Sequence, residues 1–223
     1  MVDNDDGSAN RSSQVYDELR SLLLSGSFEP NTRLTEAELT RMFTVSRGTI
    51  RPLLVRLAHE GYVAGEANRG VRTRSFSVEE AADILEARET LESALAGKAA
   101  ERATEEEIEE MRRTLAEMER AEQRGDEQGY SKGNRQFHQL VKHAAHQYTL
   151  AKAYDGLLYP LVMRQYRDLA APHPRAGSLQ EHQTIFLAIV TRNSAAAVAA
   201  MHHHVGSARR ALLLGGPGGE PGR

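Results

Sequence analysis

The 223-residue sequence contains no cysteine and no tryptophan, and only 5% of its residues are aromatic. Without cysteine the chain has neither disulfides nor a thiolate metal site, so a bound metal would need nitrogen or oxygen ligands. No apolar run approaches the ~20 residues that span a bilayer, and the acidic start MVDNDDGSAN lacks the charge of a signal peptide. These absences predict a soluble, cytoplasmic protein with no membrane partner.

The charge of the chain is unevenly distributed. The formal net charge is −3, yet residues 11–76 contain ten arginines against seven acidic residues, a local charge of +3. A basic segment in an acidic chain is where a polyanion such as DNA would bind. Because this excess is small, we expect a homodimer to double the phosphate contacts.

Residues 45–63, VSRGTIRPLLVRLAHEGYV, have the pattern of a DNA recognition helix. Ser46 is a favourable N-cap residue, and Gly61 is a favourable stop. Arginine and hydroxyl side chains stand near the N-terminal end, where helix-turn-helix proteins contact base edges and phosphates. Apolar residues recur at three- and four-residue steps, which predicts one buried face: Ile50, Leu53, Leu54 and Leu57.

The segments on either side complete a winged helix-turn-helix. Thr35 and Glu38 form a capping box that opens a short helix ending near Phe43. Only two residues separate that helix from Ser46, so the two helices must cross steeply. After the recognition helix, the extended runs 62–63 and 71–74 and the turn 65–70 predict a two-stranded wing.

Pro52 lies six residues into the recognition helix. Proline removes a backbone donor and crowds the carbonyl group of Gly48, at a cost of up to ~3 kcal/mol in a regular helix interior. The sequence therefore predicts either a bent helix or a helix that starts later.

Residues from about Val15 to Arg74 resemble the winged-helix domain of the GntR family of bacterial transcription regulators. The matching motifs are the turn Gly26–Pro30, the segment Arg33–Glu36, the segment Val45–Arg47 and the closing segment Arg56–Gly61. The resemblance implies a double-stranded DNA operator, contacted by Arg33, Ser46, Arg47, Thr49, Arg51, Arg69, Gly70 and Arg72. Arg47 and Arg51 could equally contact phosphates without reading bases.

Beyond residue 77 the pattern is helical. We expect helices at 77–101, 104–124, 127–146, 148–171, 178–193 and 195–214, with capping boxes at Ser77–Glu80, Thr104–Glu107 and Ser178–Glu181. The predicted fold is mainly α: a winged helix-turn-helix followed by an all-α six-helix bundle. The expected limits are 11–74 for the DNA-binding domain, 75–77 for a linker, 78–214 for the helical domain, and 1–10 and 215–223 for disordered ends.

The helical part resembles the FCD effector domain of the FadR subfamily of GntR regulators, and its six helices are similar to the VanR-type branch. The resemblance implies a homodimer whose effector is a small carboxylate bound at a metal site, with Asn134, His138, His182 and His204 as ligands. Two spacings agree with such a site. Asn134 and His138 share one helix face, and His182 and His204 each lie 11 residues from Asn193, where a chain reversal would bring them to the same height.

Asn134 stands where the family most often has aspartate. An amide oxygen is a weaker, uncharged ligand, so the affinity for metal should fall and the remaining positive charge should favour an anionic effector. Three imidazoles suit a divalent transition metal such as zinc or nickel. The alternative is a degenerate site, in which the histidines are only polar core residues.

Arg88 falls in the middle of the apolar stripe of the helix at 77–101. A cation in that place needs an anion. The partner is either Glu92, one turn further along the helix, or the carboxylate of the effector.

The expected function is that of a ligand-responsive regulator, a repressor associated with the nucleoid, which leaves its operator when the effector binds. One alternative is a direct metal sensor, for which the ion itself is the signal. The other is a metal-dependent enzyme, against which the sequence offers neither an H-E-x-x-H motif nor the E-x-x-H pairs of di-iron bundles.

Overall fold

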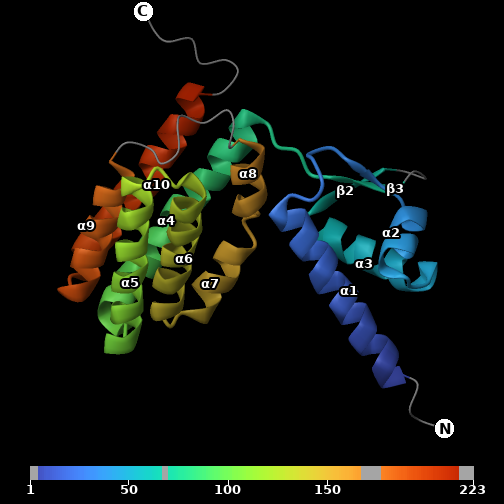
Figure 1. Ribbon diagram of the computed structural model, residues 1–223, viewed down its shortest axis with the longest axis horizontal. Helices are drawn as coiled ribbons and strands as arrows, with labels where there is room; N and C mark the ends of the chain where they lie inside the picture. The colour runs from blue at the N-terminus through green and yellow to red at the C-terminus, as the bar shows by residue number, and fades with distance from the viewer. Residues whose placement is uncertain (1–4, 67–69, 167–176, 216–223) are drawn as a thin grey trace, which may run out of the picture. The chain divides into compact units, whose positions relative to one another are not determined.

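The computed structural model describes residues 5–66, 70–166 and 177–215 (Figure 1). The chain forms two compact units. The first comprises the residues up to Ser77 together with Pro160–Gln165, and the second comprises Val78–Tyr159 and the residues from Tyr166 onward. Within the described ranges, no helix has the length and apolar composition needed to cross a membrane.

The first unit contains the predicted helix-turn-helix. Helix α1 spans Asp5–Ser25, α2 spans Glu36–Phe43 and α3 spans Arg47–His59. The Thr35–Glu38 capping box is confirmed, and Thr44 makes the turn into α3 with a left-handed backbone. The three helices share a core to which each contributes buried apolar side chains: Val15, Leu19, Leu23, Leu39, Phe43, Ile50, Leu53, Leu54 and Leu57.

Helix α3 runs without interruption through Pro52. The Ser46 side chain accepts a hydrogen bond from the Thr49 amide, so the helix begins at Arg47 and the predicted later start is wrong. The buried face of α3 holds the helix in place while the proline ring lies on the exposed face. Gly61, at a φ of 80°, ends the helix as predicted, and the Tyr62 amide bonds back to the Leu57 carbonyl group.

A three-stranded antiparallel sheet completes this unit. Strand β3, Gly70–Thr73, lies between β1, Arg33–Leu34, and β2, Val63–Glu66. The predicted two-stranded wing is confirmed as β2 and β3. Strand β1 was not predicted, because two residues are too short to show an alternating pattern.

The predicted disorder of residues 1–10 is corrected for residues 5–10, which belong to α1, while residues 1–4 lie outside the described ranges. Once the helix is nucleated by its buried part around Val15 and Leu19, each further residue adds one backbone hydrogen bond, so the helix extends beyond its packed face. Of the other predicted disordered end, Gly215 is the last residue of α10, and residues 216–223 lie outside the described ranges.

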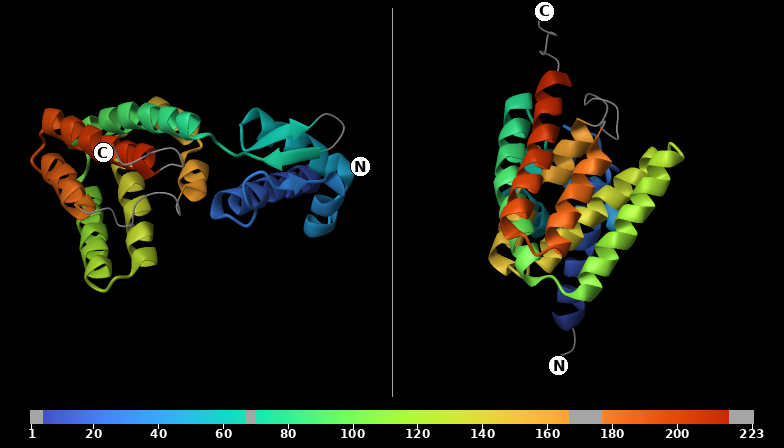
Figure 2. Two further views of the ribbon diagram at one scale, coloured as in Figure 1. Left: turned by 90° about the horizontal axis from the view of Figure 1, so that it is seen from above. Right: turned by 90° about the vertical axis from the view of Figure 1, so that its left-hand side faces the viewer.

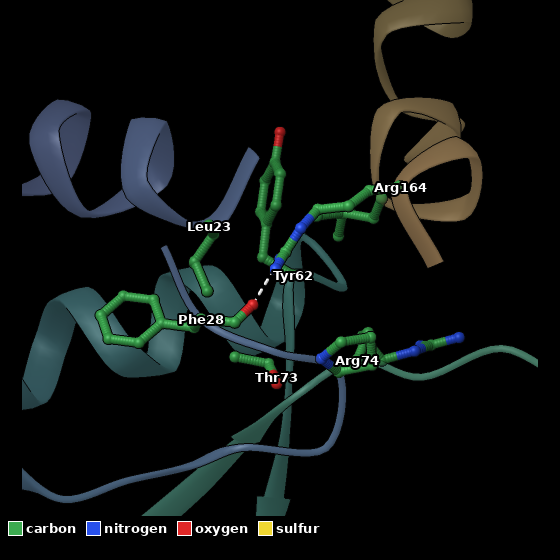
Figure 3. A pocket seen from close by; sticks show the side chains of 8 residues that line it. Leu23, Phe28, Tyr62, Thr73, Arg74 and Arg164 are labelled. Atoms are coloured by element: carbon green, nitrogen blue, oxygen red, sulfur yellow. Dashed lines mark hydrogen bonds between the residues drawn. The ribbon is translucent and has the colours of Figure 1, made fainter. Parts of the chain in front are cut away.

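A small pocket in the first unit is lined by residues that include Leu23, Phe28, Tyr62 and Arg164 (Figure 3). The Arg164 guanidinium points across it and donates a hydrogen bond to the Phe28 carbonyl oxygen (Figure 3). The enclosed space is about 10 Å³, enough for roughly one water molecule. This pocket is therefore too small for an organic effector.

Six helices lie in the described part of the second unit. The long helices α4 and α10 pack side by side, and α5 packs against α6 (Figure 2). Their shared core is rich in alanine and methionine, with Tyr130 and Phe137 as its largest members. The bounds are α4 Val78–Arg102, α5 Glu105–Gln123, α6 Glu127–Ala144, α7 Tyr148–Asp155, α9 Ser178–Val190 and α10 Ser194–Gly215.

Two predictions for these helices were wrong. The single helix expected at 148–171 is two helices, α7 and α8 (Tyr159–Gln165), because Pro160 would clash with the carbonyl group of Gly156 in a continuous helix. Residues 167–171 of that prediction lie outside the described ranges. The capping box at Ser178 is absent: Gly177 is the N-cap of α9 and no side chain caps it. The box at Thr104–Glu107 is confirmed.

We predict that Gly70→Ala destabilises the first unit. Gly70 has a φ of 93°, and an added Cβ would lie 2.8 Å from the Leu34 carbonyl oxygen in β1. An L-residue in such a conformation costs about 1–2 kcal/mol, and the clash with paired backbone adds to it. Urea unfolding followed by circular dichroism measures the loss. Gly65→Ala in β2 is the matched control, since its Cβ would meet nothing within 4 Å; equal effects of the two substitutions would refute the argument.

Candidate metal centre and nucleic-acid interface

Three histidines from three helices meet inside the second unit. His138 comes from α6, His182 from α9 and His204 from α10, and each is at most 5% exposed. Their nearest ring nitrogens all lie within 4.8 Å of one another. The chain reverses between α9 and α10 at residues 191–193, as the spacing around Asn193 predicted, and the His182 and His204 rings lie 4.2 Å apart between centroids.

The Nδ1 atoms of these rings face hydrogen-bond acceptors. His182 Nδ1 donates to the Ser178 carbonyl oxygen at 2.6 Å, and His204 Nδ1 donates to Glu181 Oε2 at 2.8 Å. A proton on Nδ1 leaves the Nε2 of a neutral imidazole as a lone pair. Both Nε2 atoms are therefore available as ligands, with ring orientations fixed by the Nδ1 contacts.

The Nε2 atoms of His138 and His204 are 3.2 Å apart. Two imidazoles bound to one ion at ~2.1 Å place their nitrogens roughly 3.0–3.4 Å apart for ligand angles between the octahedral and tetrahedral values. The spacing in the protein falls in this range. This one pair therefore has the spacing of two ligands of a single ion, and the three ligand nitrogens together lie within 4.8 Å of one another.

His138 also contacts Arg88 and Glu92 of α4 through its Nδ1 atom. Glu92 Oε1 lies 3.2 Å from Nδ1, and Arg88 Nη2 lies 3.3 Å from it. If Nδ1–H donates to Glu92, Nε2 is a free lone pair; if Nδ1 accepts from Arg88, Nε2–H points at His204 and closes a hydrogen bond. The second arrangement is the polar-core alternative.

The Nε2 atom of His182 distinguishes the two arrangements. It is buried and has no hydrogen-bond partner among the described residues, and neither tautomer of His138 supplies one. A buried nitrogen acceptor without a partner costs free energy. A cation shared by three imidazoles would satisfy it, so the residues present fit a metal ion better than a polar core.

Burial also keeps two of the imidazoles neutral. It lowers the pKa of His182 well below its ordinary value of 6.5 and lowers the pKa of His204 to about 4, although Glu181 partly opposes the second shift. Only the neutral form of histidine binds a metal. At neutral pH these two rings are ready to bind without first losing a proton.

The predicted alternative for Arg88, an ion pair with Glu92, is present at 2.9 Å. Both side chains are buried, and the guanidinium lies over the Tyr159 ring, 3.7 Å from its centroid. Burial alone would raise the pKa of Glu92, but Arg88 and His138 outweigh it and hold that pKa well below its usual range. Glu92 is therefore ionised beside the histidine cluster.

Asn134 lies on α6, one turn before His138, and is half-buried. This position agrees with the shared helix face expected from the sequence. Its role as a fourth ligand stays a prediction.

Most of the predicted DNA contacts lie on α3 and the sheet. Arg47 and Arg51 are exposed near the start of α3, while Thr49 is half-buried. Ser46 is exposed, and its hydroxyl group caps the helix. Arg51 lies 3.8 Å from Glu36 of α2, a loose and exposed ion pair. Arg33 and Arg72 are paired across β1 and β3, Gly70 begins β3, and Arg69 lies outside the described ranges.

Sequence reasoning missed the groups that orient the histidines. Glu181 was assigned to a helix cap, yet it bonds to His204, and the carbonyl group of Ser178 bonds to His182. Glu92 was considered only as a partner of Arg88, yet it also contacts His138. The sequence signal was weak, because carboxylates at one-turn spacing are common on exposed helix faces.

A winged helix-turn-helix with an arginine-bearing recognition helix, joined to a helical domain with a buried histidine cluster, defines a DNA-binding transcriptional regulator. Comparison with known families agrees with this class. Residues 11–73 match the bacterial regulatory proteins of the gntR family, and residues 83–207 match the FCD domain. The chain therefore belongs to the GntR family of regulators, in the FadR-like group that carries an FCD domain.

The similarity to known proteins extends over most of the chain. The chain is 27% identical over 184 residues to YdhC, an uncharacterized HTH-type transcriptional regulator of Bacillus subtilis, covering 81% of each chain. It is 25% identical over 180 residues to the HTH-type transcriptional repressor RspR of Escherichia coli, covering 81% of this chain and 79% of RspR. The E. coli McbR/YncC structure shares the fold, with a TM-score of 0.75 at 17% identity over 91% of this chain and 97% of that chain. The relatives are transcriptional regulators, so this protein is a regulator and not an enzyme.

We predict that His138→Ala removes bound metal. The substitution deletes one of three converging imidazoles, so the metal content of untagged protein should fall at least about tenfold, the effect typical of an altered metal site. Elemental analysis of identically prepared samples measures it. His143→Ala is the control, because His143 is exposed on the same helix.

Metal-free wild-type protein that also fails to take up added zinc or nickel would support the polar-core alternative. The same measurement on Asn134→Ala tests the fourth ligand, which should lower the affinity for metal less than the loss of a histidine.

Proposed function

We propose that the protein is a repressor that binds a palindromic operator as a homodimer and leaves it when a small carboxylate binds at the metal centre. The observation that carries the effector half of this proposal is the buried Nε2 of His182, which faces two further imidazoles and has no hydrogen-bond partner in the part of the chain that the structure describes. The repressor half is supported by the similarity to RspR, whose name describes a repressor. The proposal that operator binding represses transcription, and does not activate it, rests on this similarity alone.

The DNA interface is formed by α3 and by the sheet. Arg47, Arg51, Ser46 and Thr49 would enter the major groove, while the cations of the sheet contact phosphates. The pairing of Arg33 with Arg72 supports this role. Arg33 of β1 lies opposite Arg72 of β3, so two cations share one region of the sheet, which suits contact with phosphates. We infer that Gly70 and Arg69 of the wing contact the sugar-phosphate backbone of the DNA at the adjacent groove.

The metal centre would hold a divalent transition ion such as zinc or nickel through His138, His182 and His204, with Asn134 as a neutral oxygen ligand. The ion supplies a Lewis acid that attracts a carboxylate group. Since the amide of Asn134 contributes no charge, the attraction for an anion is greater than it would be with aspartate.

Arg88 is the second anchor of the effector in this proposal. Its guanidinium group lies over the Tyr159 ring, and its Nε atom has no hydrogen-bond partner among the described residues. Arginine binds carboxylates through two parallel N–H groups, and Nε is one of the groups that can take part. A carboxylate effector that reaches Arg88 would therefore find a donor that Glu92 does not use.

A direct metal sensor is the second candidate function. The specific observation in its favour is that Arg88 is already paired with Glu92, so this cation has an anionic partner without an organic acid. The two candidates differ in one measurement: operator affinity would follow added metal in a sensor and added carboxylate in an effector-responsive repressor.

The remaining assignments are also proposals. A cytoplasmic, nucleoid-associated location follows from the DNA-binding role. The VanR-type branch is supported by the six helices in the described part of the second unit. The domain limits of 11–74, 75–77 and 78–214 stay a prediction.

We predict that Arg51→Ala abolishes specific operator binding while leaving dimerisation intact. The side chain is 80% exposed, so its loss should not disturb the core, and loss of a bidentate contact to guanine costs about 1–3 kcal/mol per half-site. Fluorescence anisotropy with labelled duplexes measures binding, and sedimentation measures the oligomer. If the variant kept its full sequence-specific affinity, α3 would not be the recognition helix.

We predict that His182→Ala loses the response to the effector but keeps operator binding, because His182 and α3 belong to different compact units. The dose response of operator release to small carboxylates is the readout. An unchanged dose response would exclude the metal centre from the mechanism, and loss of operator binding would indicate misfolding.

A further inference from the structure

On the exposed side of the recognition helix, directly opposite its buried face, three residues along one line lack side chains that can form hydrogen bonds. Gly48, Pro52 and Val55 follow one another at steps of four and three residues, so they lie along one line of α3. All three are exposed, and this line is opposite the buried face of the helix. Val55 is 66% exposed.

Stability does not explain these residues. Proline in a helix interior removes a hydrogen bond, and valine on an exposed helix face is a poorer helix former than alanine. Neither side chain is buried to offset these costs, since both lie on the exposed side of α3. Residues that weaken their own helix without compensating packing are typical of functional surfaces.

The surroundings of the line favour nucleic acid over protein. Arg47 and Arg51 flank it on one side and are exposed. On the other side lies Arg56, which pairs with Glu60 at 2.9 Å and lies over the Tyr16 ring. The apolar line is therefore bordered by cations suited to phosphates and bases, in the element that enters the major groove.

We propose that Pro52 and Val55 read thymine through its 5-methyl group. Neither side chain can donate or accept a hydrogen bond, so neither can read the donors and acceptors of the base edges. The methyl group of thymine is the apolar feature that a base pair presents in the major groove. Gly48 allows close approach because it has no side chain, and the fold itself does not require glycine there, since an added Cβ would meet only the Ser46 hydroxyl, at 3.5 Å.

This inference rests on the proposed role of α3 and adds the base that the operator must contain. Each half-site has one or two thymines opposite Pro52 and Val55, beside the base contacted by Arg51.

The test uses the full-length protein and a pool of duplexes with a randomised centre. After selection of the bound duplexes, each thymine of the enriched sequence is replaced in turn by deoxyuridine, which pairs identically and lacks only the methyl group. We expect at least one thymine per half-site at which binding weakens about fourfold, the ratio that corresponds to burial of one methyl-sized group.

Three variants assign the contact. Val55→Ala and Pro52→Ala should each lose most of the deoxyuridine penalty at the thymine that the replaced side chain contacts. Pro52→Ala should also raise the melting temperature of the protein by restoring the helix hydrogen bond. Met42→Ala is the matched control, an exposed apolar side chain of α2, and should keep the full penalty.

The outcomes separate this inference from the proposed function. If no duplex is enriched, the operator-binding proposal fails and the thymine contact with it. If a sequence is enriched but tolerates deoxyuridine at every position, or if the penalty persists unchanged in both α3 variants, the thymine contact is overturned while α3 remains the recognition helix.

Discussion

The second unit is organised around buried imidazole nitrogens, each of which needs a hydrogen-bond partner or a metal ion. Three rings from α6, α9 and α10 turn their Nε2 atoms towards one point, and their Nδ1 atoms are held by α4 and α9. Four helices thus contribute to one polar centre inside an apolar core. Because the Nδ1 contacts fix the orientation of each ring, the centre is pre-organised. Binding or loss of a metal ion or effector there acts on four helices at once.

The ion pair of Arg88 and Glu92 extends this centre along α4. Removing one member of a buried pair leaves an uncompensated charge and costs far more than the pair contributes, so the two charges must be kept or exchanged together. An incoming anion therefore has to replace Glu92 at Arg88 or add to it at a free donor. This constraint links the charge of the effector to the charge of the metal centre.

The first unit follows a different principle, in which stability is given up on one exposed line. The buried face of α3 is fully apolar, and its caps at Ser46 and Gly61 are well formed. Only the exposed face contains a proline and an unpacked valine. A firmly held helix tolerates these residues, so the surface that meets DNA can be chosen for recognition and not for helix propensity.

The sequence alone determined the local structure: the caps at Thr35 and Thr104, the C-terminal end of α3, the wing, and the antiparallel reversal that aligns His182 with His204. Each depends on contacts between near neighbours in the chain, which leave patterns in the sequence. Tertiary structure decided what Glu92, Glu181 and Ser178 do, because their partners lie on other helices or face inward at a depth that spacing does not reveal. It also decided that α3 passes through Pro52, since only the packed core compensates for the lost hydrogen bond.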